Sequence, residues 1–144
     1  MPKTFHVGIK GVIRVNGKCL ALKKQGVKDV FWDLPGGRIN DDEEVEEALR
    51  RELREELPSL GEYRIGAQLG VHRFHRDFFP ELFPGVGLFV VFYHVEAVPF
   101  EVVLSPEHQE FKWVSLENIA ELKNDPDAIT GPGYYNALVA SLKQ

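Results

Sequence analysis

The sequence predicts an α/β fold in which helices pack against a β-sheet, and three observations lead to this prediction. The chain has 144 residues, a normal length for one compact domain with its own core. Its composition, with 44% hydrophobic and 27% charged residues, is that of an ordinary globular protein. Apolar, strand-like runs alternate along the chain with helix-like segments, as they do in α/β sandwiches. We therefore expect residues 1–144 to form a single α/β domain.

The first part of the chain predicts a β-hairpin followed by a loop and a turn. Val7–Val15 and Cys19–Lys24 are strand-like runs, and Asn16-Gly17 between them is a strong hairpin signal. Gln25–Val30 is expected to be a loop. Phe31–Arg38 begins with apolar residues and ends with residues that favour a turn.

A helix is expected next, over Glu43–Leu57. Residues of the type that commonly cap helices precede it, namely Asn40, Asp41 and Asp42. Pro58 ends it, because proline has no backbone N–H and its ring clashes with the preceding turn.

The second half of the chain continues the alternation of strands and helices. Tyr63–Phe74 is expected to be a strand, and His75–Gly85, which contains two prolines, is expected to be a long loop. Val86–Val98 is a long apolar run that fits a buried central strand. The remaining elements are a short strand, a short helix capped by Ser115, a loop and a terminal helix: Phe111–Val114, Leu116–Leu122, Asp125–Gly133 and Tyr134–Lys143.

The composition argues against several classes of location and partner. No run approaches the ~18 apolar residues of a membrane span, and the first residues lack the apolar stretch of a signal peptide. The net charge is −5 and the basic residues are dispersed, which disfavours binding to duplex nucleic acid. The single cysteine, Cys19, lies in an apolar run and is interpreted as a buried thiol. We expect a cytoplasmic protein, and a homodimer is kept open.

The expected helix has an acidic face beside an apolar one. Apolar residues at every fourth position are expected to face the core: Val45, Leu49 and Leu53, widened by Ala48 and Leu57. Glu52, Glu55 and Glu56 stand at i, i+3 and i+4 and therefore share a neighbouring face. Like charges at this spacing repel, so their convergence makes sense around a divalent cation such as Mg²⁺ or Mn²⁺, which prefers oxygen ligands.

The same face has a plain alternative interpretation as a solvated helix surface. Arginines alternate with the glutamates and would pair with them: Arg50, Arg51 and Arg54. The residues before the helix argue for the metal instead, because Gly36-Gly37 would let the backbone approach a ligand closely.

The spacing of these residues is specific. After Gly37 the chain has five residues, Glu43, seven residues, and then the run Arg51-Glu52-Leu53-Arg54-Glu55-Glu56. This pattern resembles the Nudix box, G-x5-E-x7-R-E-U-x-E-E-x-G-U, in which U is a bulky aliphatic residue. The end departs from the box, because Pro58 and Ser59 replace its last glycine and aliphatic residue. The segments Trp32–Gly37 and Glu107–Glu117 also resemble the family.

The resemblance implies a Nudix-type α/β/α sandwich with a mixed β-sheet. It further implies metal-dependent hydrolysis of a phosphoanhydride bond in a nucleoside diphosphate linked to another moiety, which releases a nucleoside monophosphate or an equivalent product. Mg²⁺ would be the cofactor, with Mn²⁺ as a substitute. Its ligands by position would be the backbone carbonyl of Gly36 and the side chains of Glu52, Glu55 and Glu56. Gly37 and Arg38 are expected to bind the phosphate-bearing ligand.

The resemblance also implies which residues take part in catalysis: Arg51, Glu55, Glu56 and Glu107. Arg51 would pair with a box glutamate and orient it, and Glu43 would support the loop or the metal shell. The general base is left open between Glu107, Glu110 and a box glutamate, because the family's motif does not assign it.

Two other functions are considered. The chain could be a catalytically silent nucleotide-binding domain, although the intact acidic set argues against this. It could also be a sugar-nucleotide hydrolase that attacks at carbon, because Ser105–Glu110 and Tyr134-Tyr135 loosely resemble such enzymes. The expected partner is a small-molecule nucleotide, and neither its base nor its second moiety follows from the box.

Histidines and phenylalanines outside the box receive plainer interpretations. The spacing of four histidines is not that of a zinc site, and each is interpreted as structural or exposed: His72, His75, His94 and His108. Four phenylalanines are interpreted as packing for the long loop rather than as a platform for a base: Phe74, Phe78, Phe79 and Phe83.

Overall fold

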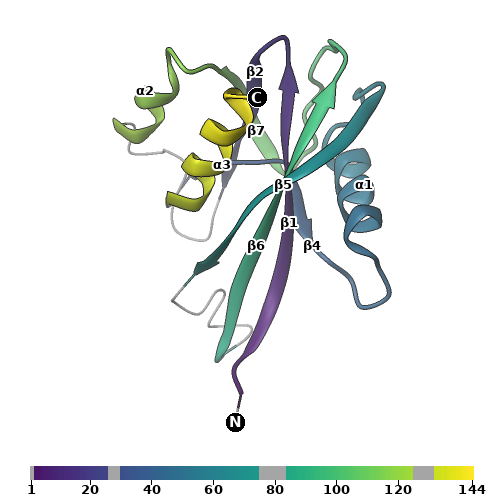
Figure 1. Cartoon of the computed structure of the whole chain (residues 1–144). Helices are drawn as coiled ribbons and strands as arrows, with labels where there is room; N and C mark the ends of the chain where they lie inside the picture. The colour runs from purple at the N-terminus through teal and green to yellow at the C-terminus, as the bar shows by residue number, and fades with distance from the viewer. Residues whose placement is uncertain (1, 26–29, 75–83, 125–131) are drawn as a thin grey trace.

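A twisted β-sheet forms the middle layer of the protein, and helices cover both of its faces (Figure 1). The computed structural model describes residues 2–25, 30–74, 84–124 and 132–144. One face carries α1 (Val45–Glu56), and the other carries α2 (Ile119–Asn124) and α3 (Pro132–Leu142). These three layers confirm the expected α/β/α sandwich. No helix among the described residues is long and apolar enough to cross a membrane.

Within the described residues, seven strands form one mixed sheet. Five of them run in the order β3-β2-β1-β6-β5, while β4 pairs with β1 and β7 pairs with β2. The pair β1–β6 is parallel and the other pairs are antiparallel. The strands are β1 (Thr4–Val15), β2 (Lys18–Gln25), β3 (Val30–Asp33), β4 (Gly36–Arg38), β5 (Tyr63–Phe74), β6 (Val86–Ala97) and β7 (His108–Val114).

The first two strands stay together only near their turn, and this divergence creates the place for a site. Asn16 and Gly17 have φ angles of 49° and 78°, as the predicted hairpin turn requires. Further along, β4 takes the place of β2 beside β1, with Lys10 opposite Gly36, while β2 pairs with β3 and β7. The short connection from β3 to β4 therefore crosses from one half of the sheet to the other.

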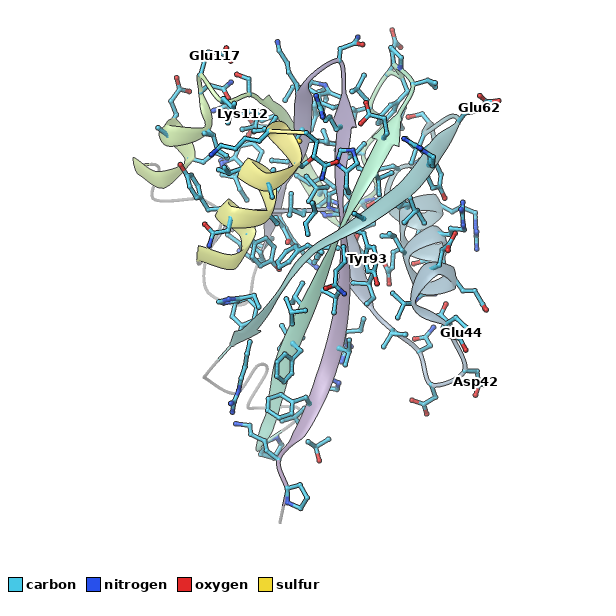
Figure 2. The ribbon with its side chains drawn as sticks, viewed as in Figure 1. Asp42, Glu44, Glu62, Tyr93, Lys112 and Glu117 are labelled. Atoms are coloured by element: carbon cyan, nitrogen blue, oxygen red, sulfur yellow. The ribbon has the colours of Figure 1, made fainter. Side chains whose placement is uncertain are left out.

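The start of α1 differs from the prediction. None of the three expected capping residues caps it: the helix begins at Val45, and its N-cap Glu44 makes no side-chain capping hydrogen bond. Instead the Asn40 N–H donates to the carboxylate of Glu43 at 2.9 Å, so the loop is held by Glu43. Asp42 and Glu44 lie at the outer edge of this loop (Figure 2).

The apolar stripe of α1 faces the sheet, with one exception. Its middle and last positions are buried, among them Leu49 and Leu53 at 1% exposure each. Val45 is 37% exposed, so its assignment to the core is wrong. The first helical turn lies over a groove shared with Ile65 and Tyr93, rather than over closed packing.

Two hydrophobic clusters, one on each face of the sheet, hold the layers together. The α1 side contains Ile9, Ile13, Leu20, Leu22, Leu49, Leu53 and Val95, and the α3 side contains Val12, Cys19, Trp32, Phe92, Val114, Tyr134 and Leu138. Strand β6 lies between β1 and β5, which confirms the predicted central strand. Cys19 is fully buried, as expected, and burial raises the pKa of its thiol to about 11.

The later part of the chain shifts some expected boundaries. Helix α2 begins at Ile119 rather than Leu116, and Ser115 accepts the Ile119 N–H through its backbone carbonyl at 2.9 Å rather than capping with its side chain. Strand β7 begins earlier than expected, at His108. The loops expected over residues 25–30, 75–85 and 125–133 lie largely outside the described residues.

Candidate metal centre

The connection between β3 and β4 brings Gly36 to the centre of the site. Gly36 has a φ angle of 139°, a conformation that favours glycine, and a Cβ on it would overlap the backbone carbonyl of Ile9. The Pro35 carbonyl accepts the Gly11 N–H at 2.8 Å, which anchors the connection to β1. The backbone of Gly36 therefore lies directly against the sheet and below the last turns of α1.

Glu56 reaches this backbone from α1. Its carboxylate accepts the Gly36 N–H at 2.9 Å, and the residue is only 3% exposed. Burial raises the pKa of Glu56 to about 7, although Lys10 and the Gly36 N–H act in the opposite direction. The protein neighbours of Glu56 therefore balance its negative charge only in part, as expected where a bound cation would balance the rest.

Glu52 lies one turn earlier on the same side of the helix. Its carboxylate occupies the space beside Gly37 that a Cβ on that residue would need. A side chain at position 37 would displace the Glu52 carboxylate from this place beside β4. Together, Glu52 and Glu56 bring two carboxylates against the Gly36-Gly37 backbone.

Arg51 organises the outer side of this arrangement. Its guanidinium donates to Glu43 at 2.6 and 2.9 Å and to Glu52 at 2.9 Å. It also donates to the backbone carbonyl of Arg38 at 3.0 Å. The hydrogen bonds to Glu43 and Glu52 raise the pKa of Arg51, and the hydrogen bond from Arg51 lowers the pKa of Glu43. The fork geometry of arginine suits several acceptors at once and fixes the loop to the helix.

Glu55 lies apart from the other two glutamates. Its side chain is 58% exposed, and its carboxylate is 3.4 Å from Arg51. The structure thus brings Glu52 and Glu56 to the glycine backbone, while Glu55 stays on the solvent side of the same end of α1.

The start of β7 adds a further group to the site. Carboxylate or imidazole atoms of Glu56, Glu107 and His108 all lie within 4.8 Å of one another. Glu107 is exposed, whereas His108 is 6% exposed, and burial lowers the pKa of its imidazole. Glu110 points elsewhere, because its carboxylate is 3.8 Å from the Lys23 ammonium and its side chain is 60% exposed.

The sequence interpretation did not identify a buried ion pair on the opposite side of Gly36. The Lys10 ammonium donates to Asp33 at 3.0 Å and to the Gly36 carbonyl at 3.4 Å, and Lys10 and Asp33 are 8% and 5% exposed. The Tyr134 hydroxyl bonds to the same Asp33, and burial raises the pKa of that hydroxyl. Burial alone would lower the pKa of Lys10, but Asp33 and its acidic neighbours raise it, so the ammonium stays charged.

The signal for this pair was present in the sequence. Lys10 interrupts the apolar run of β1, and a charged residue in the middle of a strand buried on both faces needs a partner. The sequence interprets His108 as structural or exposed, whereas the structure places its imidazole close to the carboxylate of Glu56.

The donor set fits a hard divalent cation. Carboxylate oxygens of Glu52 and Glu56 and the Gly36 carbonyl are the oxygen ligands that Mg²⁺ and Mn²⁺ prefer, and Glu107 lies beside them. The raised pKa of Glu56 agrees with this interpretation, since a cation would compensate the buried charge.

The other residues singled out in the sequence have plainer surroundings. Arg38 is exposed, and its guanidinium is 3.5 Å from His6. His94 is buried between Ser141 and Glu96, whereas His72 packs against the ring of Phe74. His75, Phe78, Phe79 and Phe83 lie outside the described residues.

The chain is similar to known proteins in sequence and in fold. The model of the NUDIX domain family matches residues 3–131. The nucleoside triphosphatase NudI of Salmonella heidelberg is 28% identical over 107 residues, which cover 71% of this chain and 74% of that protein. The MutT protein of Methanosarcina mazei has a similar structure, with a TM-score of 0.72, 24% identity, and coverage of 99% of this chain and 96% of that one. The ORF135 protein of Escherichia coli has a TM-score of 0.71 and 24% identity, covering 98% and 91%.

Proposed function

The chain belongs to the NUDIX family, and from that premise we propose that it hydrolyses a phosphoanhydride bond in a nucleoside diphosphate derivative with the help of Mg²⁺. One observation carries the proposal: the carboxylates of Glu52 and Glu56 meet the Gly36-Gly37 backbone beside the start of β7. The products would be a nucleoside monophosphate and a second phosphorylated compound. We propose the cytoplasm as the location, since Cys19 is a buried free thiol.

The metal would be held by the Gly36 carbonyl and by carboxylates of α1. Glu56 contacts Gly36, Glu52 lies beside Gly37, and Glu55 is the third carboxylate at the same end of the helix. When bound, the cation neutralises phosphate charge and lowers the pKa of bound water, and Mn²⁺ would substitute for Mg²⁺.

The neighbouring residues of the chain orient these ligands and the substrate. Arg51 holds Glu52 in place and ties α1 to the loop through Glu43. The backbone of Gly37 and the side chain of Arg38 stand at the exposed side of β4, where they would bind the phosphates. Arginine suits this role because its donors match phosphate oxygens.

Glu107 is the proposed general base. A base must reach the attacking water and then release the proton to solvent, so it needs both proximity and exposure. Glu107 is close to Glu56 and is exposed, whereas Glu56 is buried and holds the Gly36 N–H. Glu110 is directed towards Lys23, which makes it a suitable control.

The substrate class is proposed from the relatives and from a cavity on the α3 side of the sheet. NudI is named a nucleoside triphosphatase, so nucleoside triphosphates are the first substrates to test. A cavity of about 290 Å³ lies between β5 and α3, lined in part by His72, Phe92 and Asn136. We propose that it takes the nucleoside, because the His72 ring and the Asn136 amide in its lining suit the face and the edge of a base.

A second candidate is attack at a sugar carbon of a nucleotide sugar. His108 favours it, because the Ser105–Glu110 segment loosely resembles the late segment of such enzymes and the structure places His108 beside Glu56. The intact acidic helix favours attack at phosphorus.

Hydrolysis in ¹⁸O-labelled water separates these functions. A panel of nucleoside triphosphates, nucleotide sugars, dinucleoside polyphosphates and ADP-ribose is incubated with Mg²⁺ or Mn²⁺, and the products are analysed by mass spectrometry. We expect ¹⁸O in a phosphate product and loss of turnover with EDTA. Label in a released sugar would support the second candidate, and turnover that survives EDTA would contradict metal dependence. Nucleotide binding without any turnover would indicate a silent binding domain.

A further inference from the structure

We propose that the buried Lys10–Asp33 ion pair, anchored by Tyr134, is a positioning device that holds the Gly36 carbonyl in the orientation needed to bind the metal. The inference rests on the proposed function, because it concerns the same metal centre. It gives a role to Lys10, Asp33 and Tyr134, which all lie outside the Nudix box.

Gly36 is held from two sides. Its N–H donates to Glu56 of α1 at 2.9 Å, and its carbonyl oxygen accepts from the Lys10 ammonium at 3.4 Å. Gly36 has no side chain of its own to fix its peptide, so its orientation depends on the pairing of β4 with β1 and on these two contacts. The contacts from α1 and β1 therefore restrain both polar groups of this residue. A carbonyl has two lone pairs, so the contact with Lys10 leaves one for a cation.

The ion pair is itself held in place. One Asp33 oxygen accepts from Lys10 at 3.0 Å, and the other accepts the Leu34 N–H at 2.8 Å. The Tyr134 hydroxyl of α3 also bonds to Asp33, and its ring packs edge-on against Phe92 with centroids 5.1 Å apart. The polar chain therefore runs from α3 through the sheet to the Gly36 carbonyl.

Stability alone is a weak reason for such a pair. Burying two charges costs desolvation energy, and neutral residues of similar volume often give an equally stable protein. The pair does join three segments, namely β1, the end of β3 and β4, at the point where the sheet divides. The Gly36 carbonyl lies at this junction, in contact with the Lys10 ammonium.

The test removes the pair as a unit. The double variant Lys10→Met/Asp33→Asn deletes one positive and one negative charge, so the net charge of −5 is kept. The variant therefore removes the contact with the Gly36 carbonyl without changing the net charge of the protein. The matched control is Glu46→Gln/Arg50→Gln, which removes an exposed pair at 2.8 Å on α1.

Binding of Mn²⁺ to the folded, substrate-free protein is measured by electron paramagnetic resonance of free Mn²⁺, with circular dichroism to check the fold. We expect the double variant to bind Mn²⁺ about 10- to 100-fold more weakly than the parent, the usual effect of losing groups that orient a metal ligand. Tyr134→Phe should give a smaller weakening in the same direction, and the control should equal the parent.

Three results would overturn the inference. If the folded double variant binds Mn²⁺ like the control, the pair is only structural. If the double variant does not fold, the Mn²⁺ affinity of Tyr134→Phe is the test, and an affinity equal to that of the parent would overturn the proposal. A parent that binds no Mn²⁺ would remove the proposed function itself, and the inference with it.

Discussion

Two cationic side chains hold the same short strand, β4, from opposite sides. Arg51 contacts the backbone carbonyl of Arg38 from the solvent side, with 23% of its side chain exposed. Lys10 contacts the carbonyl of Gly36 from the core side, with 10% exposed. Arg51 is part of a motif and pairs with several carboxylates. Lys10 lies in an apolar strand and, among the described residues, pairs with the carboxylate of Asp33.

The difference shows how one backbone segment can be fixed by two kinds of interaction. On the solvent side several hydrogen bonds share the task, so the loss of one is buffered by the others and by water. On the core side each polar group is buried, so an unpaired partner is costly. Variants on the two sides should therefore differ in their effects on metal affinity, on the rate of hydrolysis and on the stability of the fold.

The largest effect on the reaction is expected from Glu56→Gln. The amide keeps the volume and still accepts the Gly36 N–H, but it removes the buried negative charge that the cation would meet. We expect loss of nearly all hydrolysis of the best substrate in Mg²⁺, with native circular dichroism. If hydrolysis persists at the parental rate, Glu56 is not a metal ligand.

A smaller loss is expected from the solvent side of the same cluster. Glu107→Gln should lower kcat by about 10²- to 10⁴-fold, the range of a general base, with a smaller change in KM. Glu110→Gln, whose parent side chain faces Lys23, should lose little. The reverse ranking would assign the base to Glu110, and no loss in either variant would return it to α1.

The third prediction concerns stability without metal. The pKa of Glu56 is raised from 4.5 to about 7 by burial, so the folded protein binds a proton more tightly than the unfolded chain. The parent should therefore lose stability as the pH rises from about 4.5 through 7, and Glu56→Gln should escape this loss. At pH 8 with EDTA the variant should be more stable by up to about 3 kcal/mol.

Urea unfolding of both proteins at pH 5 and pH 8 tests this prediction. At pH 5 the difference between them should be small, because the folded carboxyl is mostly protonated. A variant that is less stable than the parent at pH 8 would show that the carboxylate is already well compensated by Lys10.

The smallest effect is expected from Arg51→Lys. Lysine keeps the positive charge but cannot contact Glu43 through two nitrogens while reaching Glu52 and the Arg38 carbonyl. We expect about tenfold weaker Mn²⁺ binding, at the low end of the range for groups that orient ligands. A loss as large as that of Glu56→Gln would mean that Arg51 contacts the substrate directly.

The box could be read from the sequence because its spacing follows the helix. Glu52 and Glu56 differ by one turn and both reach β4, where the Glu52 carboxylate lies directly beside Gly37. The family assignment is confirmed by the match over residues 3–131. The strands with clear alternation or apolar runs were also predicted, including Tyr63–Phe74 at its observed ends.

Other features depended on contacts between distant segments. Lys10 and Asp33 are far apart in the chain, and only the divergence of β1 and β2 brings them together. Glu55 shares a helix face with its neighbours by spacing, but the sheet reaches only part of that face. The capping prediction failed for a similar reason, because Glu43 pairs with Arg51 eight residues away and the loop follows that pair.

Anomalous diffraction from crystals grown with Mn²⁺ tests the account most directly, because it locates the metal without relying on activity. We expect an anomalous peak for Mn²⁺ within bonding distance of the Gly36 carbonyl and of carboxylate oxygens of Glu52 and Glu56, with Lys10 still paired to Asp33. A peak elsewhere on α1, or none in crystals of a protein that hydrolyses nucleotides with Mn²⁺, would contradict it.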